Sequence, residues 1–412
     1  MDAHSRLLRS AFDAAVAAAD PRLWLAPEIR ALSRPAGAVR VLALGKAAIP
    51  MAQAFAEAFE GDWSGLAIAP VGTARPVDGF MVIEGAHPVP DGRSQAAGEA
   101  ALAFARTAGP GDLLLVLISG GASALACAPI PGVSLAAKAE VTRALLASGA
   151  AIGEVNAVRR ALSRLKGGGL ARATGAGRVV TLAVSDVPGD AIADIGSGPA
   201  MPSPTGPAEA LAVLNARAPA LAGALAEPIL GWAEAAGPIL ARTEGRVVLP
   251  LDGGVRAAAA ALAIKGWPVE QLGVLGGDAD EACERHLRRL ADGRRRAVIS
   301  GGELSVAVPP EATGKGGRNQ HFLLCLTAAL AGRGDVWGLA ADTDGIDGTS
   351  PAAGAWIDPA LLAGLDADEA RASLAAFDAH GFFERHGRLV ETGPTGVNVG
   401  DLRILLVDPV PR

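Results

Sequence analysis

Short runs of aliphatic residues alternate with alanine-rich segments through the first half of the chain, and this alternation constrains the fold more than any other feature. The runs are mostly apolar, so they predict strands that are buried on both faces. Such strands occur in parallel sheets whose crossover helices cover both faces. The pattern predicts a doubly wound, mostly parallel α/β domain. Its expected strands are Val39–Leu44, Leu66–Ala69, Phe80–Glu84, Leu113–Ile118 and Arg178–Val184, and its expected helices are Ala47–Phe59, Ser94–Thr107, Leu135–Ala147 and Ile152–Leu165.

A second series of strands begins after a helical stretch with several prolines, residues 207–241. Two of its strands follow each other closely between Ser300 and Val308, which predicts a hairpin and therefore a mixed sheet. We expect a Rossmann-like α/β domain over residues 1–235 and a second, mixed-sheet α/β domain over residues 236–412. The expected strands of the second domain are Arg246–Pro250, Pro268–Leu275, Ala297–Ser300, Leu304–Val308, Asp335–Ala341 and Leu402–Val407, and its helices are Gly254–Lys265, Ala279–Leu290 and Gln320–Ala331.

The composition argues against several classes of partner. The formal net charge of −6 disfavours non-specific binding to nucleic acid or to anionic lipid. Three widely separated cysteines fit neither a disulfide framework nor a zinc signature, which favours a reducing compartment. The uncharged segment Leu113–Ala137 contains prolines and paired glycines, which favour a buried strand and loop over a transmembrane helix. We expect a cytoplasmic protein without a nucleic-acid or membrane partner. The sequence is compatible with a homodimer.

Two loops place a cation at the start of an expected helix. Ligands in open α/β sheets bind beyond the carboxyl ends of the strands, so loops after strands are the places to examine. Lys46 follows the first strand, and Arg318 precedes the helix expected from Gln320. The helix macrodipole disfavours a cation there unless an anion such as phosphate is bound, and a solvated surface side chain is the structural alternative. Further candidate contacts to a bound anion are Gly45 beside Lys46, and Gly316, Gly317 and Asn319 beside Arg318.

The loop Ser119–Ser123 follows another expected strand and contains paired glycines. Consecutive glycines let backbone N–H groups approach an anion without an intervening side chain. The loop lacks the lysine of a Walker A motif and the flanking glycines of a hydrolase elbow. We interpret it as an anion-binding loop, with a plain tight turn as the alternative. Its candidate contacts are Ser119, Gly120, Gly121 and Ser123.

Two further segments have a structural explanation that is about as strong as the functional one. The turn His87–Gly92 is stiffened by two prolines, and His87 is placed either to contact substrate or to hold the turn. The basic segment Asn156–Gly169 carries the cations and glycines expected at a helix C-terminus. Its four cations still leave one or two for an anion, so Asn156 and Lys166 are candidate contacts.

Two acidic loops are candidates for metal or substrate contacts. Asp186 and Asp190 are four residues apart across a Pro-Gly turn, and their oxygen ligands suit Mg²⁺. The loop Asp342–Thr349 holds Asp344 and Asp347 but lacks the downstream glutamate of an EF-hand. The structural alternatives are an Asx turn for the first loop and a solvated acidic turn for the second.

In their order along the chain, these motifs resemble those of the glycerate kinases that form 2-phosphoglycerate, the MOFRL-domain family. The resemblance extends from Ala43–Lys46 to Thr395–Asn398 and covers nearly the whole chain. No single motif is decisive, but the ordered set is specific. The segments that carry it are Gly85–Gly92, Ser119–Ser123, Ser185–Asp190, Gly314–Gln320 and Thr343–Gly348.

The resemblance implies a two-domain α/β protein with its active site in the interdomain cleft. It implies D-glycerate and ATP as substrates, and catalysis by the residues that match Lys46 and Arg318. It also implies Mg²⁺, held in part by Asp186 or Asp190. For the group that orients the substrate hydroxyl, our candidates are Asp190, assigned as catalytic, and Asp344.

The chain departs from the family pattern at two places. Relatives often carry Lys-His where this chain has Arg160-Ala161, and many carry an aspartate within the stretch Thr349–Pro351. Some relatives are named hydroxypyruvate reductases, which makes an NAD(P)H-dependent reductase the alternative. The missing G-x-G-x-x-G fingerprint counts against that reading. A binding protein without catalytic activity has no need of clustered aspartates. We therefore expect ATP-dependent phosphorylation of the 2-hydroxyl of D-glycerate.

Overall fold

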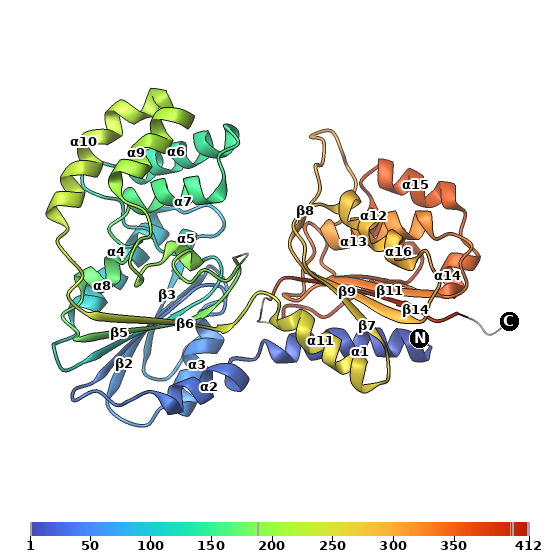
Figure 1. Cartoon of the computed structure of the whole chain (residues 1–412), viewed down its shortest axis with the longest axis horizontal. Coiled ribbons are helices and arrows are strands. Elements are labelled where there is room, and N and C mark those ends of the chain that lie inside the picture. The colour runs from blue at the N-terminus through green and yellow to red at the C-terminus, as the bar shows by residue number, and fades with distance from the viewer. Residues whose placement is uncertain (1, 188, 396, 398, 410–412) are drawn as a thin grey trace. The chain divides into compact units, whose positions relative to one another are not determined.

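The computed structural model describes residues 2–187, 189–395, 397 and 399–409. Within the motifs named above, Pro188, Gly396 and Asn398 lie outside the described residues. The chain forms two compact units, whose elements are labelled in Figure 1. We call Pro21–Pro250 the parallel-sheet unit, and Leu251–Arg412 together with Met1–Asp20 the mixed-sheet unit.

Six parallel strands form the centre of the parallel-sheet unit, in the spatial order β3-β2-β1-β4-β5-β6. Every residue of β4 is buried, as its unbroken aliphatic sequence requires. The predicted doubly wound parallel sheet is confirmed. The strands are β1 (Val39–Leu44), β2 (Trp63–Pro70), β3 (Phe80–Gly85), β4 (Leu113–Ile118), β5 (Arg178–Val184) and β6 (Arg242–Leu249).

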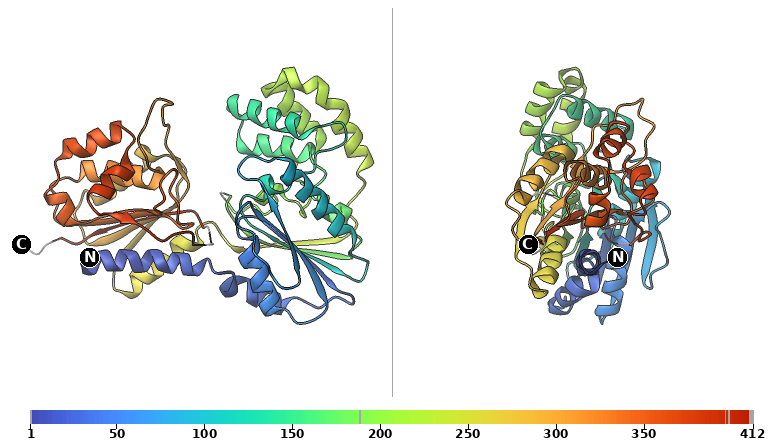
Figure 2. Two further views of the ribbon diagram at one scale, coloured as in Figure 1. Left: turned by 180° about the vertical axis from the view of Figure 1, so that it is seen from behind. Right: turned by 90° about the vertical axis from the view of Figure 1, so that its right-hand side faces the viewer.

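Helices cover both faces of this sheet. On one face, Ala97, Ala101 and Leu102 of α4 pack in the same core as the side chains of β1, β2 and β4. Figures 1 and 2 show α2 and α3 on the opposite face. The helices nearest the sheet are α2 (Pro21–Ala31), α3 (Ala48–Ala58), α4 (Gly92–Arg106), α5 (Ala122–Leu125) and α8 (Gly169–Ala173), and a short 3₁₀ helix spans Ile195–Ser197.

Four more helices form a separate helical layer in the same unit, with their own apolar core. They are α6 (Leu135–Ala147), α7 (Ile152–Ala161), α9 (Pro207–Arg217) and α10 (Pro219–Ala235). The last two begin with proline, which suits the first helical position because its missing N–H needs no partner there. Helix α7 ends earlier than expected because Ser163 Oγ accepts the N–H groups of Leu165 and Lys166.

The mixed-sheet unit also has a six-stranded sheet, in the order β13-β12-β11-β14-β9-β7. Only β7 and β9 are parallel neighbours within this sheet, so the predicted mixed sheet is confirmed. The predicted hairpin is wrong, because β10 (Leu304–Ser305) pairs in parallel with β8 (Gly277–Asp278) rather than with β9. The strands of the sheet are β7 (Val269–Val274), β9 (Arg296–Gly302), β11 (Val336–Asp342), β12 (Gly354–Ile357), β13 (Leu389–Val390) and β14 (Asp401–Val407).

Helices again cover both faces of this sheet. Helices α1 (Ala3–Ala18) and α11 (Gly253–Ile264) share a core with one face, whereas α12 (Ala279–Leu290) and α13 (Arg318–Ala329) share a core with the other. Figure 1 shows the two pairs on opposite sides. Three shorter helices lie on the second face, namely α14 (Pro359–Ala363), α15 (Ala367–Ala375) and α16 (Ala379–Arg385). Among the described residues, no helix combines the length and the apolar character needed to span a membrane.

The boundaries of the units differ from the expected 235/236 division in two ways. Strand β6, expected in the second domain, pairs with β5 in the parallel sheet. Helix α1, expected in the first domain, packs against α11 in the mixed-sheet unit. An edge strand and an amphipathic helix can each complete either sheet, so their sequence patterns do not identify the partner.

Candidate active site

The strand order of the parallel sheet predicts where a ligand would bind. The chain proceeds from β1 to one side of the sheet and from β4 to the other, so the topological switch point lies between these neighbours. In doubly wound sheets, ligands bind beyond the carboxyl ends of the strands at this point. Gly45 and Lys46 follow β1, and the loop Ser119–Ser123 follows β4.

Hydrogen bonds hold these two loops together. The backbone N–H of Lys46 donates to the Gly120 carbonyl at 2.8 Å, and the N–H of Ala47 donates to Ser119 Oγ at 3.0 Å. Gly45 has φ 134° and lies so close to Ser119 that an added Cβ would fall 2.2 Å from Ser119 Oγ. Gly45 is therefore needed for the close approach of the two loops.

Other candidate side chains gather around the glycines of the same loop. A Cβ on Gly121 would lie 3.0 Å from the His87 ring and 3.2 Å from Lys46 Cγ. A Cβ on Gly120 would lie 2.7 Å from a carboxylate oxygen of Asp186. The structure thus brings Lys46, His87 and Asp186 to one loop, from three separate strand ends.

Lys166 is joined to the same loop from the opposite side. Its Nζ donates to the Ser123 carbonyl at 2.8 Å and lies 2.7 Å from Ser123 Oγ. Ser123 Oγ also lies 3.2 Å from Ser197 Oγ. Burial lowers the pKa of Lys166 to about 7. A structural role for Lys166 and a role in anion binding are both compatible with these contacts.

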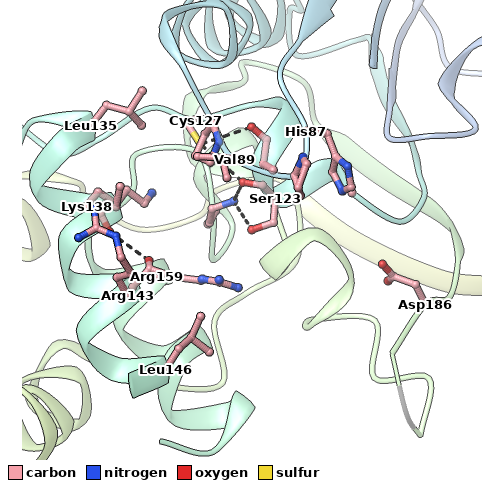
Figure 3. Close-up of a pocket in the computed structure, with 17 residues that line it drawn as sticks. His87, Val89, Ser123, Cys127, Leu135, Lys138, Arg143, Leu146, Arg159 and Asp186 are labelled. Atoms are coloured by element: carbon pink, nitrogen blue, oxygen red, sulfur yellow. Dashed lines mark hydrogen bonds between the residues drawn. The ribbon is translucent and has the colours of Figure 1, made fainter. Parts of the chain in front are cut away.

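A cavity of about 490 Å³ opens beside the loop. Figure 3 shows Lys138, Arg143 and Arg159 along one wall, with His87 and Asp186 on the other side. Sequence reasoning did not select Lys138 or Arg143, and it considered Arg159 only as one of the four cations of the basic segment Asn156–Gly169. All three come from the helical layer. The signal for two of them was the spacing on α6, where the lining residues recur at helical intervals: Leu135, Lys138, Ala139, Thr142, Arg143 and Leu146.

Six expected site residues of this unit are not among the described residues that line the cavity: Gly45, Lys46, Ser119, Gly120, Asn156 and Asp190. Asn156 is buried on α7, one turn before Arg159, but it is not among the described residues that line the cavity. Asp190 is half-buried with φ 54°, a left-handed conformation that aspartate tolerates better than most residues. It does not line the cavity either, so Asp186 is the carboxylate among the described lining residues.

Arg318 occupies a very different environment, in the mixed-sheet unit. Its guanidinium donates to Asp401 and Asp342 at 2.9 Å and to Glu303 at 2.8 Å. Burial alone would lower its pKa, but the three carboxylates outweigh burial and raise it. Burial and the neighbouring Asp401 and Asp344 raise the pKa of Asp342. Sequence reasoning missed these partners because they come from three other segments of the unit.

The residues around Arg318 contribute mainly to the start of α13. Asp347 accepts the backbone N–H groups of Asn319 at 3.1 Å and Gln320 at 2.8 Å, so it caps the helix from a distant loop. Burial raises its pKa to about 6. A Cβ on Gly317 would lie 2.3 Å from Asp347, which explains that glycine.

Two more candidates organise the adjoining loops. The N–H of Gly316 donates to Thr349 Oγ1 at 3.2 Å. Asp344 accepts the N–H of Ile346 at 2.9 Å, and its own N–H donates to Asp342 at 3.0 Å. Both contacts of Asp344 have the geometry of an Asx turn, whereas the structural alternative expected for this loop was a solvated acidic turn.

Comparison with known proteins identifies the family. Residues 7–227 match the family described as a domain of unknown function, DUF4147, and residues 296–401 match the MOFRL family. A Thermotoga maritima protein named D-glycerate 2-kinase is 34% identical over 387 residues, which cover 90% of this chain and 90% of that protein. The chain belongs to the MOFRL-domain glycerate kinase family. The resemblance inferred from the motif order is thereby confirmed.

Two further similarities bear on the glycerate kinase family assignment. The crystal structure of a Thermotoga maritima glycerate kinase superposes with a TM-score of 0.86 at 32% identity, covering 98% of this chain and 99% of the other. An Agrobacterium vitis protein named "Putative hydroxypyruvate reductase" is 40% identical over 421 residues, 98% of this chain and 94% of that protein. Both kinase and reductase names therefore occur within the family.

The described residues offer few protein ligands for Mg²⁺. Among the described residues, no group of three or more His, Cys, Asp and Glu side chains could hold a metal ion. Mg²⁺ in phosphate-transfer sites usually takes one or two carboxylates and completes its shell with water and substrate phosphate oxygens. Asp186, exposed beside the Ser119–Ser123 loop, meets that requirement.

Proposed function

We propose that this protein transfers the γ-phosphoryl group of ATP to the 2-hydroxyl of D-glycerate, forming 2-phospho-D-glycerate and ADP. The observation that carries the proposal is the match to a D-glycerate 2-kinase over 90% of both chains. The structural support is the topological switch point of the parallel sheet, where Lys46 and the Ser119–Ser123 loop meet. A reaction between two anions needs such a concentration of positive charge and N–H groups.

The chain's own groups would act mainly by positioning and by charge. Phosphoryl transfer requires in-line placement of the two oxygens and stabilisation of charge on the migrating group. We assign that stabilisation to Lys46, whose exposed side chain is beside the Ser119–Ser123 loop, and to Arg318. The proposal requires one cation from each unit to act on the same phosphoryl group. Exclusion of water by closure would suppress ATP hydrolysis.

The acidic candidates divide into two roles in this proposal. Asp186 would hold Mg²⁺, which when bound neutralises charge on the phosphate oxygens. Asp190 would accept the hydrogen bond of the glycerate 2-hydroxyl and orient it, with Asp344 as the alternative. The glycines and amides of the two anion loops would bind the carboxylate or phosphate oxygens of the substrates.

An NAD(P)H-dependent hydroxypyruvate reductase is the second candidate. Two observations favour it: the name of the Agrobacterium vitis relative, and a strand order that dinucleotide-binding domains share. Dinucleotide sites of that fold need glycines after β1 and an acidic residue near the end of β2 for the ribose. Here β1 is followed by Gly-Lys-Ala-Ala, and β2 ends at Ala69-Pro70. The local sequence therefore favours the kinase.

A pair of assays separates the two candidates. The purified chain is mixed with D-glycerate, ATP and Mg²⁺, and ADP formation is followed by chromatography, with L-glycerate as the matched control. A parallel reaction contains hydroxypyruvate and NADH or NADPH, and the loss of nicotinamide absorbance is followed. The proposal predicts ADP formation that depends on D-glycerate and no loss of absorbance. Reductase turnover without ADP formation would overturn it.

A further inference from the structure

The cavity beside the Ser119–Ser123 loop has an unusual charge balance. Lys138, Arg143, Arg159 and Lys166 line it, against the single carboxylate of Asp186 among the described lining residues. None of the four cations has a carboxylate partner within the described part of the chain. Lys138 and Lys166 are buried, Arg159 is half-buried and Arg143 is exposed. Buried cations are normally paired, so the two buried lysines lack a carboxylate counter-ion.

Neighbouring arginines show that this unit pairs its cations elsewhere. Arg160, adjacent to Arg159, donates to Asp194 at 2.8 Å. Arg164, one turn further along the chain, donates to Glu99. The two paired arginines do not line the cavity, whereas the unpaired Arg159 does. Of these three arginines on or near α7, the one without a carboxylate partner is the one that lines the cavity.

Lys138 is the clearest sign that an anion is missing. Its side chain is 6% exposed, and its Nζ has no hydrogen-bond partner among the described residues. Burial lowers its pKa to about 8, and the nearby positive charge of Arg159 acts in the same direction. A buried amine without a partner destabilises the folded protein unless a ligand supplies the negative charge.

The size and charge of the cavity select the class of ligand. A volume of about 490 Å³ exceeds what a three-carbon acid fills and lies in the range of roughly 300–1,000 Å³ typical of larger ligands. A single carboxylate would leave most of the four cations unpaired. A multiply charged phosphate compound would pair them all, and Arg143 and Arg159 offer planar groups that suit phosphate oxygens.

We infer that this cavity is a phosphate subsite in which Lys138, Arg143 and Arg159 bind a multiply charged phosphate compound, rather than the carboxylate of the acceptor. The inference deepens the proposed function and rests on it for the choice of compound. Two sources share the chemistry: the polyphosphate chain of the nucleotide and the phosphorylated product. Lys166 and Ser123 border the same subsite.

The test is isothermal titration calorimetry of the full chain with inorganic tripolyphosphate, 2-phospho-D-glycerate and D-glycerate. Arg143→Gln should weaken binding of at least one phosphate compound by about 10- to 100-fold, the range for a lost charge-assisted hydrogen bond. The matched control is Arg106→Gln, an exposed arginine on α4 that lies outside the cavity lining, which should leave binding unchanged. The compound that loses affinity identifies the source.

A second variant separates ligand binding from a structural role. Lys138→Met removes a buried amine without a partner, so it should raise the thermal midpoint of the free protein while weakening phosphate binding. A purely structural lysine would give the opposite change in midpoint. Binding near pH 8.5 should also take up protons, because a bound anion favours the charged form of Lys138 and Lys166. Comparing heats in two buffers of different ionisation enthalpy measures the uptake.

The outcomes distinguish this inference from the proposed function. The inference is overturned if neither Arg143→Gln nor Lys138→Met weakens phosphate binding. It is also overturned if both variants selectively weaken D-glycerate binding. Either result would stand even if D-glycerate-dependent ADP formation is observed. Weakened phosphate binding in a chain that forms no ADP would uphold the subsite and overturn the kinase proposal.

Discussion

At the residue scale, the two cations proposed for catalysis have contrasting surroundings. Lys46 is exposed, and backbone hydrogen bonds hold its loop in place. Arg318 is held by three carboxylates, two of which are almost fully buried. Both stand at the start of a helix in the sequence, which is why sequence reasoning gave them the same role. The structure predicts different consequences for their removal.

Lys46→Ala should lower kcat by roughly 10²–10⁴ and leave stability nearly unchanged, because it removes a charge-stabilising group that packs little. Steady-state kinetics with D-glycerate and a thermal unfolding curve measure the two effects. Lys265→Ala, at an exposed position after α11, is the control and should retain full activity. Turnover at the parental rate in Lys46→Ala would refute its assignment.

Arg318→Ala should lower the free energy of unfolding by about 3 kcal/mol, because Asp401 and Asp342 would lose their partner in a buried site. Urea unfolding measures the loss. Arg371→Ala breaks an exposed pair with Asp368 and should change stability by no more than about 1 kcal/mol. If Arg318→Ala were as stable as this control, the buried network would contribute no more to stability than an exposed ion pair does. A role of Arg318 in the reaction is better tested with Arg318→Lys, which keeps the charge and loses the fork.

At the scale of the elements, helix α13 depends on a cap that lies far away in sequence. Its N-cap residue is Gly317, which has no side chain to accept a hydrogen bond, and Asp347 supplies the acceptor instead. This explains why an acidic loop that could have served a metal or substrate is buried against the helix. The same loop contains Asp344 in an Asx turn.

Asp347→Ala should lower the free energy of unfolding by about 1–2 kcal/mol, since two N–H groups of the first turn lose their acceptor. Equilibrium unfolding in urea is the measurement, and Glu311→Ala, in an exposed loop, is the control. Stability should also decline as pH rises from about 4 to 6. Burial raises the pKa of Asp347 in the folded state, so the folded state binds the proton more tightly than the unfolded state across that range. An unchanged midpoint in Asp347→Ala would contradict the capping role.

The elements that sequence could predict are those whose pattern is independent of neighbours. The strand Leu113–Ile118 and the helix Leu135–Ala147 were predicted to the residue, because an unbroken apolar run and a capped amphipathic segment each favour one structure. Strand β12 was missed because Gly-Ala-Trp-Ile is too short and too poor in β-branched residues to stand out. Pairing between β8 and β10 was missed because two-residue strands carry no pattern.

At the scale of the whole molecule, each unit closes its core with an element that sequence assigned to the other. Helix α1 begins the chain but buries Leu8 and Phe12 in the core of the mixed-sheet unit. Its apolar residues recur at helical spacing, which predicts a buried face but not the surface it covers. Sequence reasoning located the loops of the site because the carboxyl ends of parallel strands share one edge. It missed Lys138 and Arg143, which join Arg159 in the cavity wall, because a separate helical layer carries those side chains there.

Phe12→Ala should destabilise the mixed-sheet unit by about 3–5 kcal/mol, the usual effect of removing a buried aromatic side chain. Hydrogen exchange followed by mass spectrometry should show faster exchange in β9, β11 and β14, whereas β1 and β4 should be unaffected. Arg9→Ala, on the exposed side of the same helix, is the control. Faster exchange in β1 and β4 instead would contradict the packing of α1 in the mixed-sheet unit.

The most direct test of the account is the position of the transferred phosphate. The chain is incubated with D-glycerate, ATP and Mg²⁺, and the product is examined by phosphorus NMR with proton coupling. The account predicts a new phosphate monoester signal coupled to the single proton on carbon 2, and no such signal from Lys46→Ala on the same time scale. A monoester coupled to the two protons on carbon 3, or phosphorus that remains only in nucleotide and inorganic phosphate, would contradict it.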